Sequence, residues 1–243
     1  MTILRIIALV IYITVCSTIG IITLPFDRNH NIYFWLSRVF PWGILKISGV
    51  KIVATGKENI DVSRAYVYVP NHSSLFDIPV MQLSVPNRMV MIFKKELGKI
   101  PFFGWQLVLG PYISVDRKNP KSGMQSIEEA DRLLNERKYS VLLFAEGTRS
   151  KDGEVHEFKR GAFYLAVKVK HPIVPVTLVG CRERANAGGK FKIVPGTVYV
   201  HYDKPIYPPE GNIGKKEELE LMATVRNKII ENKERMEREY FGR

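Results

Sequence analysis

The sequence predicts an α/β fold, a mixed β-sheet flanked by helices, preceded by an N-terminal segment of two membrane-associated helices. Three features support this prediction: a long apolar run opens the chain, short β-type runs follow after residue 50, and helix-type patterns separate several of them. The 243 residues, 46% of them hydrophobic, can form one core of ordinary size. We therefore expect membrane-anchoring helices in residues 1–48 and one folded domain in residues 49–243.

The opening apolar run covers residues 3–24 and carries one charge, at Arg5. About 20 apolar residues in a helix can cross a hydrocarbon core of roughly 30 Å. A cleaved signal peptide is disfavoured because the run is too long and no A-x-A-like site follows it. A buried core helix would be unusually uniform in composition. We therefore interpret the run as a retained membrane anchor.

A second segment, residues 32–50, follows a turn and is rich in Phe, Trp and Tyr. It carries Arg38 and Lys46 and is interrupted by a Pro-Trp-Gly sequence at 41–43. Aromatic and isolated basic residues favour the membrane–water interface over the bilayer centre. The two segments predict a helical hairpin that dips into one leaflet, with a single span and an interfacial helix as the alternative. Basic residues further along the chain place the remaining domain on the cytoplasmic face of the cell membrane.

After residue 50 the pattern alternates between strands and helices. Apolar, β-branched and aromatic runs predict strands at 50–55, 65–70, 88–93, 112–115, 140–145, 173–179 and 197–202. Helical patterns occupy 76–84, 121–137 and 160–170, and a long charged helix is expected at 215–240. Such alternation indicates a mixed sheet in an α/β domain, and sites in these sheets gather in the loops at strand ends.

The formal charge of +12 is concentrated in the middle of the chain. Residues 91–121 hold six Lys or Arg against two acidic residues, and residues 146–192 hold ten against five. A basic field suits nucleic acid, an anionic membrane surface or a phosphorylated substrate. Nucleic acid is disfavoured as a partner because the sequence has no helix–turn–helix, RNP-type or zinc-finger pattern. The two cysteines, Cys16 and Cys181, lack the spacing of a disulfide framework or a zinc site.

The first loop with unusual chemistry is residues 71–77, NHSSLFD, directly after a predicted strand. His72 and Asp77 lie five residues apart across the junction between this loop and a helix. A carboxylate there can accept a hydrogen bond from one imidazole nitrogen, fix the tautomer and leave the other nitrogen as a base. The alternative is a turn histidine, with Asp77 favoured at the helix start by the helix dipole.

The second such loop, Glu146-Gly147-Thr148-Arg149, follows the most apolar of the predicted strands. Glycine lets backbone amides approach an anion, threonine offers a hydroxyl, and arginine offers a planar fork for phosphate oxygens. A simple polar turn is the alternative. Lys94 and Arg117 are further phosphate candidates because each ends another predicted strand. For Lys99, Lys118 and Lys121 we expect solvated surface.

The sequence resembles the glycerolipid acyltransferase family, which includes lysophosphatidate and glycerol-3-phosphate acyltransferases. The resemblance spans about residues 65–180 and comes in four blocks in the order of the family. The first block is the NHxxxxD signature, which NHSSLFD resembles, and the second is similar to KKELGKIPFFGW at 94–105, running on to GPYISVDR at 110–117. The third block, FPEGTRS, is similar to FAEGTRS at 144–150, and the fourth is similar to IVPV at 173–176. Ala145 replaces the usual proline, which we expect to change loop stiffness and not chemistry.

The resemblance implies transfer of a fatty acyl group from a thioester, acyl-CoA or acyl carrier protein, to a hydroxyl. His72 would be the general base, Asp77 would hold it, and the 146–149 loop would bind glycerol phosphate, with Glu146 contacting a hydroxyl. Lysophosphatidate, acylated at the sn-2 position to give phosphatidate, is the expected acceptor. Glycerol-3-phosphate and other lysophospholipids stay open. Residues 49–243 would then be the catalytic domain.

Direct transfer without an acyl-enzyme is expected because no activated nucleophile is apparent. No GxSxG sequence exists, Cys16 lies in the anchor, and Ser73 and Ser74 are too close to His72 in sequence; Cys181 is the remaining exception. No metal and no bound cofactor are expected, and membrane lipids are expected partners. The apolar run 100–105 fits a core or an acyl-chain tunnel. A lipid-binding scaffold without activity and a phosphohydrolase or metal-dependent esterase are the rival functions.

Overall fold

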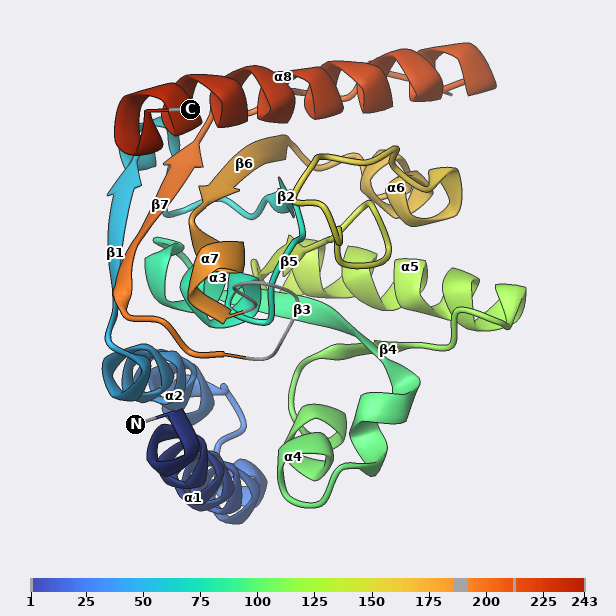
Figure 1. Ribbon diagram of the computed structural model, residues 1–243. Helices are drawn as coiled ribbons and strands as arrows, with labels where there is room; N and C mark the ends of the chain where they lie inside the picture. Colours follow the sequence, from blue (N-terminus) through green and yellow to red (C-terminus); the bar gives the residue numbers. More distant parts are fainter. Residues whose placement is uncertain (1, 186–191, 212, 243) are drawn as a thin grey trace.

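The computed structural model describes residues 2–185, 192–211 and 213–242. Within them, seven strands form one sheet with helices on both of its faces (Figure 1). The strands are β1 (Val50–Thr55), β2 (Val67–Pro70), β3 (Met89–Lys94), β4 (Ile113–Val115), β5 (Ser140–Leu142), β6 (Ile173–Val179) and β7 (Gly196–Tyr202).

The strands follow the order β1-β7-β6-β2-β5-β3-β4 across the sheet. β6 and β7 are antiparallel, and every other neighbouring pair is parallel. The prediction of a mixed sheet in an α/β fold is confirmed. β5 ends at Leu142 instead of residue 145, because the chain turns away from the sheet at Phe144, whose carbonyl accepts a hydrogen bond from the Gly147 N–H (3.0 Å).

The central strands are apolar because both faces of the sheet are covered. Every residue of β6 is buried. Along the β2 segment, Val67 and Val69 pack into the core on one face, while Tyr66 and Tyr68 pack into the core on the other.

Helices from the second half of the chain cover one face of the sheet. They are α5 (Pro120–Glu136), α6 (Arg160–Lys168) and α8 (Lys215–Phe241). Helix α8 turns Leu221, Val225 and Ile229 toward this core, one residue per turn. The opposite face is covered by α1 (Thr2–Thr23), α2 (Asn31–Ser48) and α3 (Asp77–Ser84). In Figure 1, α8 and the pair α1–α2 lie at opposite ends of the molecule.

The N-terminal segment forms two packed helices, as predicted. The buried Asp27 carboxylate fixes the turn between them by accepting hydrogen bonds from the N–H groups of Asn31 and Tyr33, each at 2.7 Å. Helix α2 continues through Pro41, so the expected interruption at 41–43 does not occur. Residues Ile3–Phe26 form the one helix in the described ranges that is long and apolar enough to cross a membrane. The boundary at residue 48 and the immersion of the hairpin in one leaflet stay predictions.

Two short helices were not predicted. Helix α4 (Phe103–Leu109) follows a 3-10 turn at Lys95–Lys99, and α7 (Cys181–Ala185) follows β6. Neither helix is long enough to show an apolar periodicity in sequence. Both lie beside the loops described below.

Candidate active site

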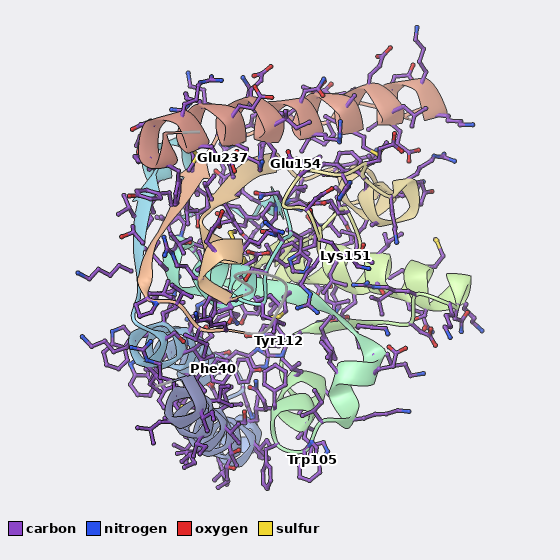
Figure 2. All side chains as sticks on the ribbon, viewed as in Figure 1. Phe40, Trp105, Tyr112, Lys151, Glu154 and Glu237 are labelled. Atoms are coloured by element: carbon purple, nitrogen blue, oxygen red, sulfur yellow. The ribbon has the colours of Figure 1, made fainter. Side chains whose placement is uncertain are left out.

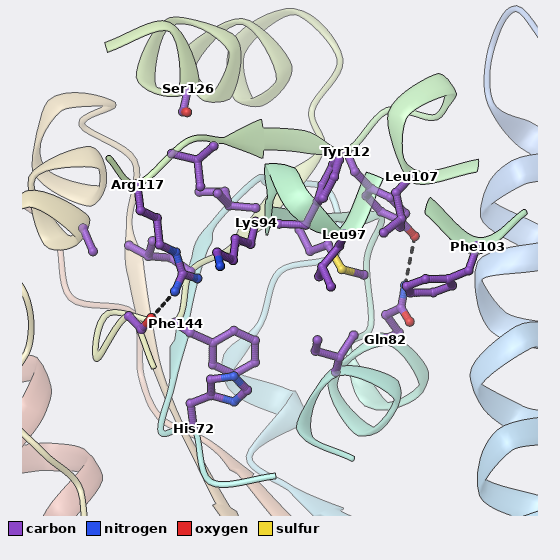
Figure 3. A pocket seen from close by; sticks show the side chains of 18 of the residues that line it. His72, Gln82, Lys94, Leu97, Phe103, Leu107, Tyr112, Arg117, Ser126 and Phe144 are labelled. Atoms are coloured by element: carbon purple, nitrogen blue, oxygen red, sulfur yellow. Dashed lines mark hydrogen bonds between the residues drawn. The ribbon is translucent and has the colours of Figure 1, made fainter. Parts of the chain in front are cut away.

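The candidate residues meet at one edge of the sheet because β2, β5, β3 and β4 are neighbours and run parallel. The carboxyl ends of parallel strands lie at the same edge. His72 follows β2, Gly147 follows β5, Lys94 ends β3 and Arg117 follows β4. These four residues line one cavity, and Figure 3 shows His72, Lys94 and Arg117 around the same space.

His72 and Asp77 form a hydrogen-bonded pair. The His72 Nδ1 lies 2.8 Å from the Asp77 Oδ2. A carboxylate with no proton can only accept, so Nδ1–H is the donor and Nε2 keeps its lone pair. The ring stacks on Phe144 with centroids 3.9 Å apart, and only 14% of the His72 side chain is exposed. The second ring nitrogen of His72, which Asp77 does not contact, is therefore left as an acceptor at the cavity wall.

Asp77 is fully buried at the first residue of α3. Its Oδ2 accepts two further hydrogen bonds, from the backbone N–H groups of Ser73 (2.7 Å) and Ser74 (2.8 Å). These amides fold the loop around the carboxylate. Oδ1 has no hydrogen-bond partner among the described residues.

The backbone of His72 is held by the second loop. Its N–H donates to the Glu146 Oε1 (2.8 Å), and its carbonyl accepts from the Ser150 N–H (2.7 Å). The Glu146 Oε2 accepts from the His156 N–H (3.1 Å). Burial raises the pKa of Glu146, which is 3% exposed. Both carboxylate oxygens thus already carry a backbone partner, which places Glu146 behind the His72 loop and not on the cavity surface.

Gly147 needs to be glycine at this position. Its φ of +71° is in the left-handed region, and a Cβ would come within 2.9 Å of the Lys159 side chain. The Gly147 carbonyl accepts a hydrogen bond from the Arg117 guanidinium. Lys159, which sequence reasoning missed, reaches the cavity because its backbone N–H bonds to Ala145 (2.8 Å).

The cavity has a basic rim. Its cations are Lys94, Arg117, Lys118 and Lys159. Lys118 was expected to be solvated surface; it is exposed but also lines the cavity. Lys94 forms an ion pair with Glu96 (3.4 Å). Thr148 and Arg149 are exposed on the neighbouring loop and do not line the cavity, and Arg149 has no hydrogen bond or ion pair with the part of the chain that the structure describes.

Behind the rim the cavity is apolar and large, about 1030 Å³. It extends between the sheet and the N-terminal helices. The lining residues on α1 share one face of that helix and are Leu9, Ile13, Cys16 and Gly20. Those on α2 and α4 include Tyr33, Leu36, Phe40, Ile44, Phe103 and Leu107. A lipid chain in this space would meet hydrocarbon along most of its length.

The cysteine and serine side chains near Asp77 are poorly suited to act as nucleophiles. Burial, together with the Asp77 carboxylate, raises the pKa of the Cys181 thiol well above its ordinary value, so the reactive thiolate is disfavoured. The Ser74 hydroxyl accepts a hydrogen bond from the Phe76 N–H (3.1 Å) at a fully buried position. In the described ranges no three His, Cys, Asp or Glu side chains gather to hold a metal ion. The expected lack of metals and cofactors stays a prediction.

The sequence matches a family model for Acyltransferase over residues 51–179. A 1-acyl-sn-glycerol-3-phosphate acyltransferase of Cocos nucifera is 34% identical over 197 residues, covering 79% of this chain and 62% of that one. The 1-acyl-sn-glycerol-3-phosphate acyltransferase beta of Homo sapiens is 30% identical over 173 residues, covering 71% and 60%. The chain spans about three fifths of the length of the first curated relatives it matches.

A similar solved structure is that of the 1-acyl-sn-glycerophosphate acyltransferase PlsC from Thermotoga maritima. The superposition has a TM-score of 0.76 with 25% sequence identity and covers 98% of both chains. The similarity therefore includes the N-terminal helices as well as the sheet.

Proposed function

The chain belongs to the acyltransferase family, and from this premise we propose that it is a 1-acylglycerol-3-phosphate O-acyltransferase. It transfers a fatty acyl group from acyl-CoA or acyl carrier protein to the sn-2 hydroxyl of lysophosphatidate and forms phosphatidate for phospholipid synthesis. The observation that carries the proposal is one cavity with three parts: the His72–Asp77 pair, a basic rim and an apolar interior.

His72 acts as the general base. Its Nε2 removes the proton of the acceptor hydroxyl while Asp77 holds the ring and stabilises the imidazolium that forms. The hydroxyl oxygen attacks the thioester carbonyl, and the tetrahedral intermediate expels the carrier thiolate. That thiolate takes the proton from His72, so the products are an oxygen ester and a free thiol. The high pKa of the Cys181 thiol supports direct transfer without an acyl-enzyme.

The phosphate of the acceptor binds at the basic rim. Arg117 and Lys94 point toward the space beside His72 (Figure 3). The Lys159 side chain lies against Gly147. Arg149, exposed and unpaired within the described ranges, supplies a planar fork at the outer edge, beside the Thr148 hydroxyl. Glu146 contributes by holding the His72 loop.

The acyl chains occupy the apolar interior, toward the N-terminal helices. A cavity lined by Leu, Ile and Phe gains about 0.8 kcal/mol for each methylene group it buries. The hairpin α1–α2 keeps this cavity at the cell membrane, where the lysophosphatidate acceptor is dissolved, with the catalytic domain on the cytoplasmic face. Glycerol-3-phosphate and other lysophospholipids are the alternative acceptors, and outside the class a lipid-binding scaffold is the rival.

The test is release of free thiol from acyl-CoA by purified protein in detergent, with lysophosphatidate, glycerol-3-phosphate or no acceptor. We expect release that depends on lysophosphatidate and yields phosphatidate. His72→Ala should abolish it while the circular dichroism spectrum and Tm stay close to those of the parent. If no thiol is released with any acceptor, either from acyl-CoA or from acyl carrier protein as donor, the lipid-binding scaffold would be favoured.

Arg149→Ala, measured in the same assay, distinguishes an effect on acceptor binding from an effect on donor binding. We expect a higher KM for lysophosphatidate and an unchanged KM for the acyl donor. A change confined to the donor would contradict the assignment of Arg149 to the phosphate.

A further inference from the structure

Residues 97–109, called the α4 segment below, expose an unusual number of large apolar side chains. Six of its thirteen residues are Leu, Ile, Phe, Trp or Val with 37–60% of the side chain exposed: Leu97, Ile100, Phe102, Trp105, Val108 and Leu109. Scattered apolar residues are normal on a protein surface, but a contiguous patch of this kind marks a binding surface. The proposed reaction does not need these side chains to be exposed.

The α4 segment is fixed to the N-terminal hairpin by its inner side. The Tyr33 hydroxyl of α2 lies 3.1 Å from both the backbone and the side-chain oxygen of Gln106. Phe103 stacks with Phe40 of α2, with centroids 6.2 Å apart, and α4 also contacts α1. Because Phe103, Gln106 and the hairpin hold the inner side, Trp105 and its exposed neighbours face outward.

Helix α4 packs beside α1, which also exposes apolar side chains. Helices α1 and α4 lie side by side at the same end of the molecule (Figure 1). The outer face of α1 exposes Ile7, Val10, Ile11 and Val15 by half or more. Figure 2 shows Trp105 at the edge of the molecule, at the end where α1 and α2 lie and away from α8.

The backbone of the segment is built for this exposure. Phe102 has φ +59° and ψ −64° and is the central residue of a γ-turn, which the Phe103 N–H closes by donating to the Pro101 carbonyl (2.7 Å); this turn is rare and strained for an L-residue. This conformation brings its ring to 5.2 Å from that of Trp105, on the exposed side. A Cβ on Gly104 would lie 2.2 Å from the Leu97 carbonyl oxygen, so the turn and the helix form one compact unit.

Charge decides which partner fits. Lys95 and Lys99 are exposed in the turn that leads into the apolar residues, and Glu96 is already paired with Lys94. Apolar and aromatic side chains flanked by lysines match a leaflet with anionic headgroups. A soluble apolar partner would not need the lysines.

We propose that the α4 segment is a second membrane-contacting element, which inserts Phe102, Trp105, Val108 and Leu109 into the same leaflet as α1 and sets Lys95 and Lys99 among anionic headgroups. This inference rests on the proposed membrane attachment of the hairpin. Leu97 and Ile100 are both exposed and part of the cavity lining, so insertion places the cavity rim at the lipid surface.

The three tryptophans of the chain allow a direct test. Trp35→Phe with Trp42→Phe leaves Trp105 as the reporter of α4; Trp42→Phe with Trp105→Phe leaves Trp35, exposed on α2, as the reporter of the hairpin. Each full-length variant is transferred into phosphatidylcholine–phosphatidylglycerol vesicles whose acyl chains carry bromine at graded depths. We expect blue-shifted emission and bromine quenching for both reporters.

The outcomes separate the inference from its premise. Quenching of Trp35 without quenching of Trp105 would overturn the α4 contact and leave the hairpin attachment standing. No quenching of either reporter would overturn both. A blue-shifted Trp105 that bromine does not quench, in a protein that sediments as a dimer, would identify a second copy of the chain as the occupant and also overturn the inference.

Substitution of the exposed residues links the contact to turnover. In Trp105→Ser with Val108→Ser, we expect a loss of activity on lysophosphatidate in vesicles and unchanged activity in detergent micelles. The matched control is Val62→Ser, which removes an equally exposed valine outside the segment and should have no effect in either assay. Equal activity of variant and control in vesicles would contradict the role.

Discussion

At Asp77 the two carboxylate oxygens have different surroundings. Oδ2 accepts hydrogen bonds from His72, Ser73 and Ser74, whereas the buried Oδ1 accepts none from the described residues. The Cys181 thiol lies beside this carboxylate, and burial and Asp77 raise its pKa, so the sulfur keeps its proton. A protonated thiol is a weak donor. We infer that Cys181 is a positioning residue: its thiol makes no regular hydrogen bond to Oδ1 but presents a neutral, polar group to the Asp77 carboxylate.

Substitution of Cys181 tests this role. Cys181→Ala removes this polar group and should lower kcat by up to roughly fivefold, the equivalent of about 1 kcal/mol. Cys181→Ser restores a polar group of similar size and should recover most of the activity. Steady-state kinetics compare kcat of the two variants, and thermal melts check that their stabilities are equal. Equal activity of the alanine and serine variants would leave Cys181 a packing residue only.

Glu146 gives a second prediction at this scale. Its two oxygens accept backbone N–H groups from His72 and His156, but a glutamine has only one acceptor oxygen. In Glu146→Gln the amide NH₂ faces a backbone N–H, which should cost about 1–3 kcal/mol of stability. We expect a lower kcat, because the His72 loop loosens, with little change in KM for the acceptor.

The control for this variant is Glu157→Gln. Glu157 is an exposed residue of the following loop, so this substitution should leave stability and kcat unchanged. A raised acceptor KM with unchanged kcat and Tm would instead favour the contact with a substrate hydroxyl that the family resemblance implies.

Sequence reasoning identified the His72–Asp77 pair because both residues belong to one local motif. It assigned Glu146 and Arg149 to one site, but their different orientations depend on tertiary contacts. Glu146 reaches His72 across 74 residues of sequence, since β2 and β5 are paired in parallel. Lys159 has no local pattern at all; its place depends on a backbone hydrogen bond to Ala145.

Among the elements, α2 and α3 are linked by the side chain of Arg38. Its Nη1 donates to the carbonyls of Gln82 (2.9 Å), Leu83 (3.3 Å) and Val85 (2.6 Å), and its Nη2 to that of Asn87 (3.1 Å). These carbonyls lie at the carboxyl end of α3 and the turn after it, where a cation is favourable. The same helix begins at Asp77, so the hairpin supports the element that carries the carboxylate of the His72–Asp77 pair.

Arg38→Met should therefore destabilise the protein beyond the loss of an ordinary surface charge. Leaving several carbonyls without their charged donor should cost about 3 kcal/mol. For a chain of this size that corresponds to a fall in Tm of roughly 6–12 °C in a thermal melt. Arg132→Met, which removes an exposed ion pair with Glu129 on α5, is the control and should change Tm by at most about 1–2 °C. Equal Tm values would show that Arg38 does not support α3.

The strands were predictable at this scale because each is an apolar run bounded by turns. The helices α5 and α6 were predictable because each repeats its apolar residues with helical spacing, and α8 was predictable as a long charged helix. Helix α4 was not predicted, because the apolar run 100–105 fits a core segment or a tunnel lining without indicating a helix. The position of α4 depends on contacts with Tyr33 and Phe40 on the hairpin. The local sequence does not indicate those tertiary contacts.

Across the whole molecule, the cavity joins the two parts of the chain that sequence reasoning treated separately. Its basic rim comes from loops of the sheet, and its apolar interior includes one face of α1. The sequence indicated an anchor from the apolar composition of α1, but composition does not reveal that one face of that helix lines the cavity containing His72. Membrane attachment and recognition of the acyl chain would then depend on the same helix.

Cys16 on α1 provides the test of this coupling, since it is 8% exposed and lines the cavity. Cys16→Trp should fill part of the apolar interior and shift the preference among acyl-CoA donors toward shorter chains. Each methylene that no longer fits should cost about 0.8 kcal/mol, close to fourfold in kcat/KM. The control is Val15→Trp, which places the same bulk on the outer face of α1, where Val15 is half exposed. If Val15→Trp shifts the chain-length preference as far as Cys16→Trp does, the effect belongs to membrane attachment and not to the cavity; if neither does, the acyl chain lies elsewhere.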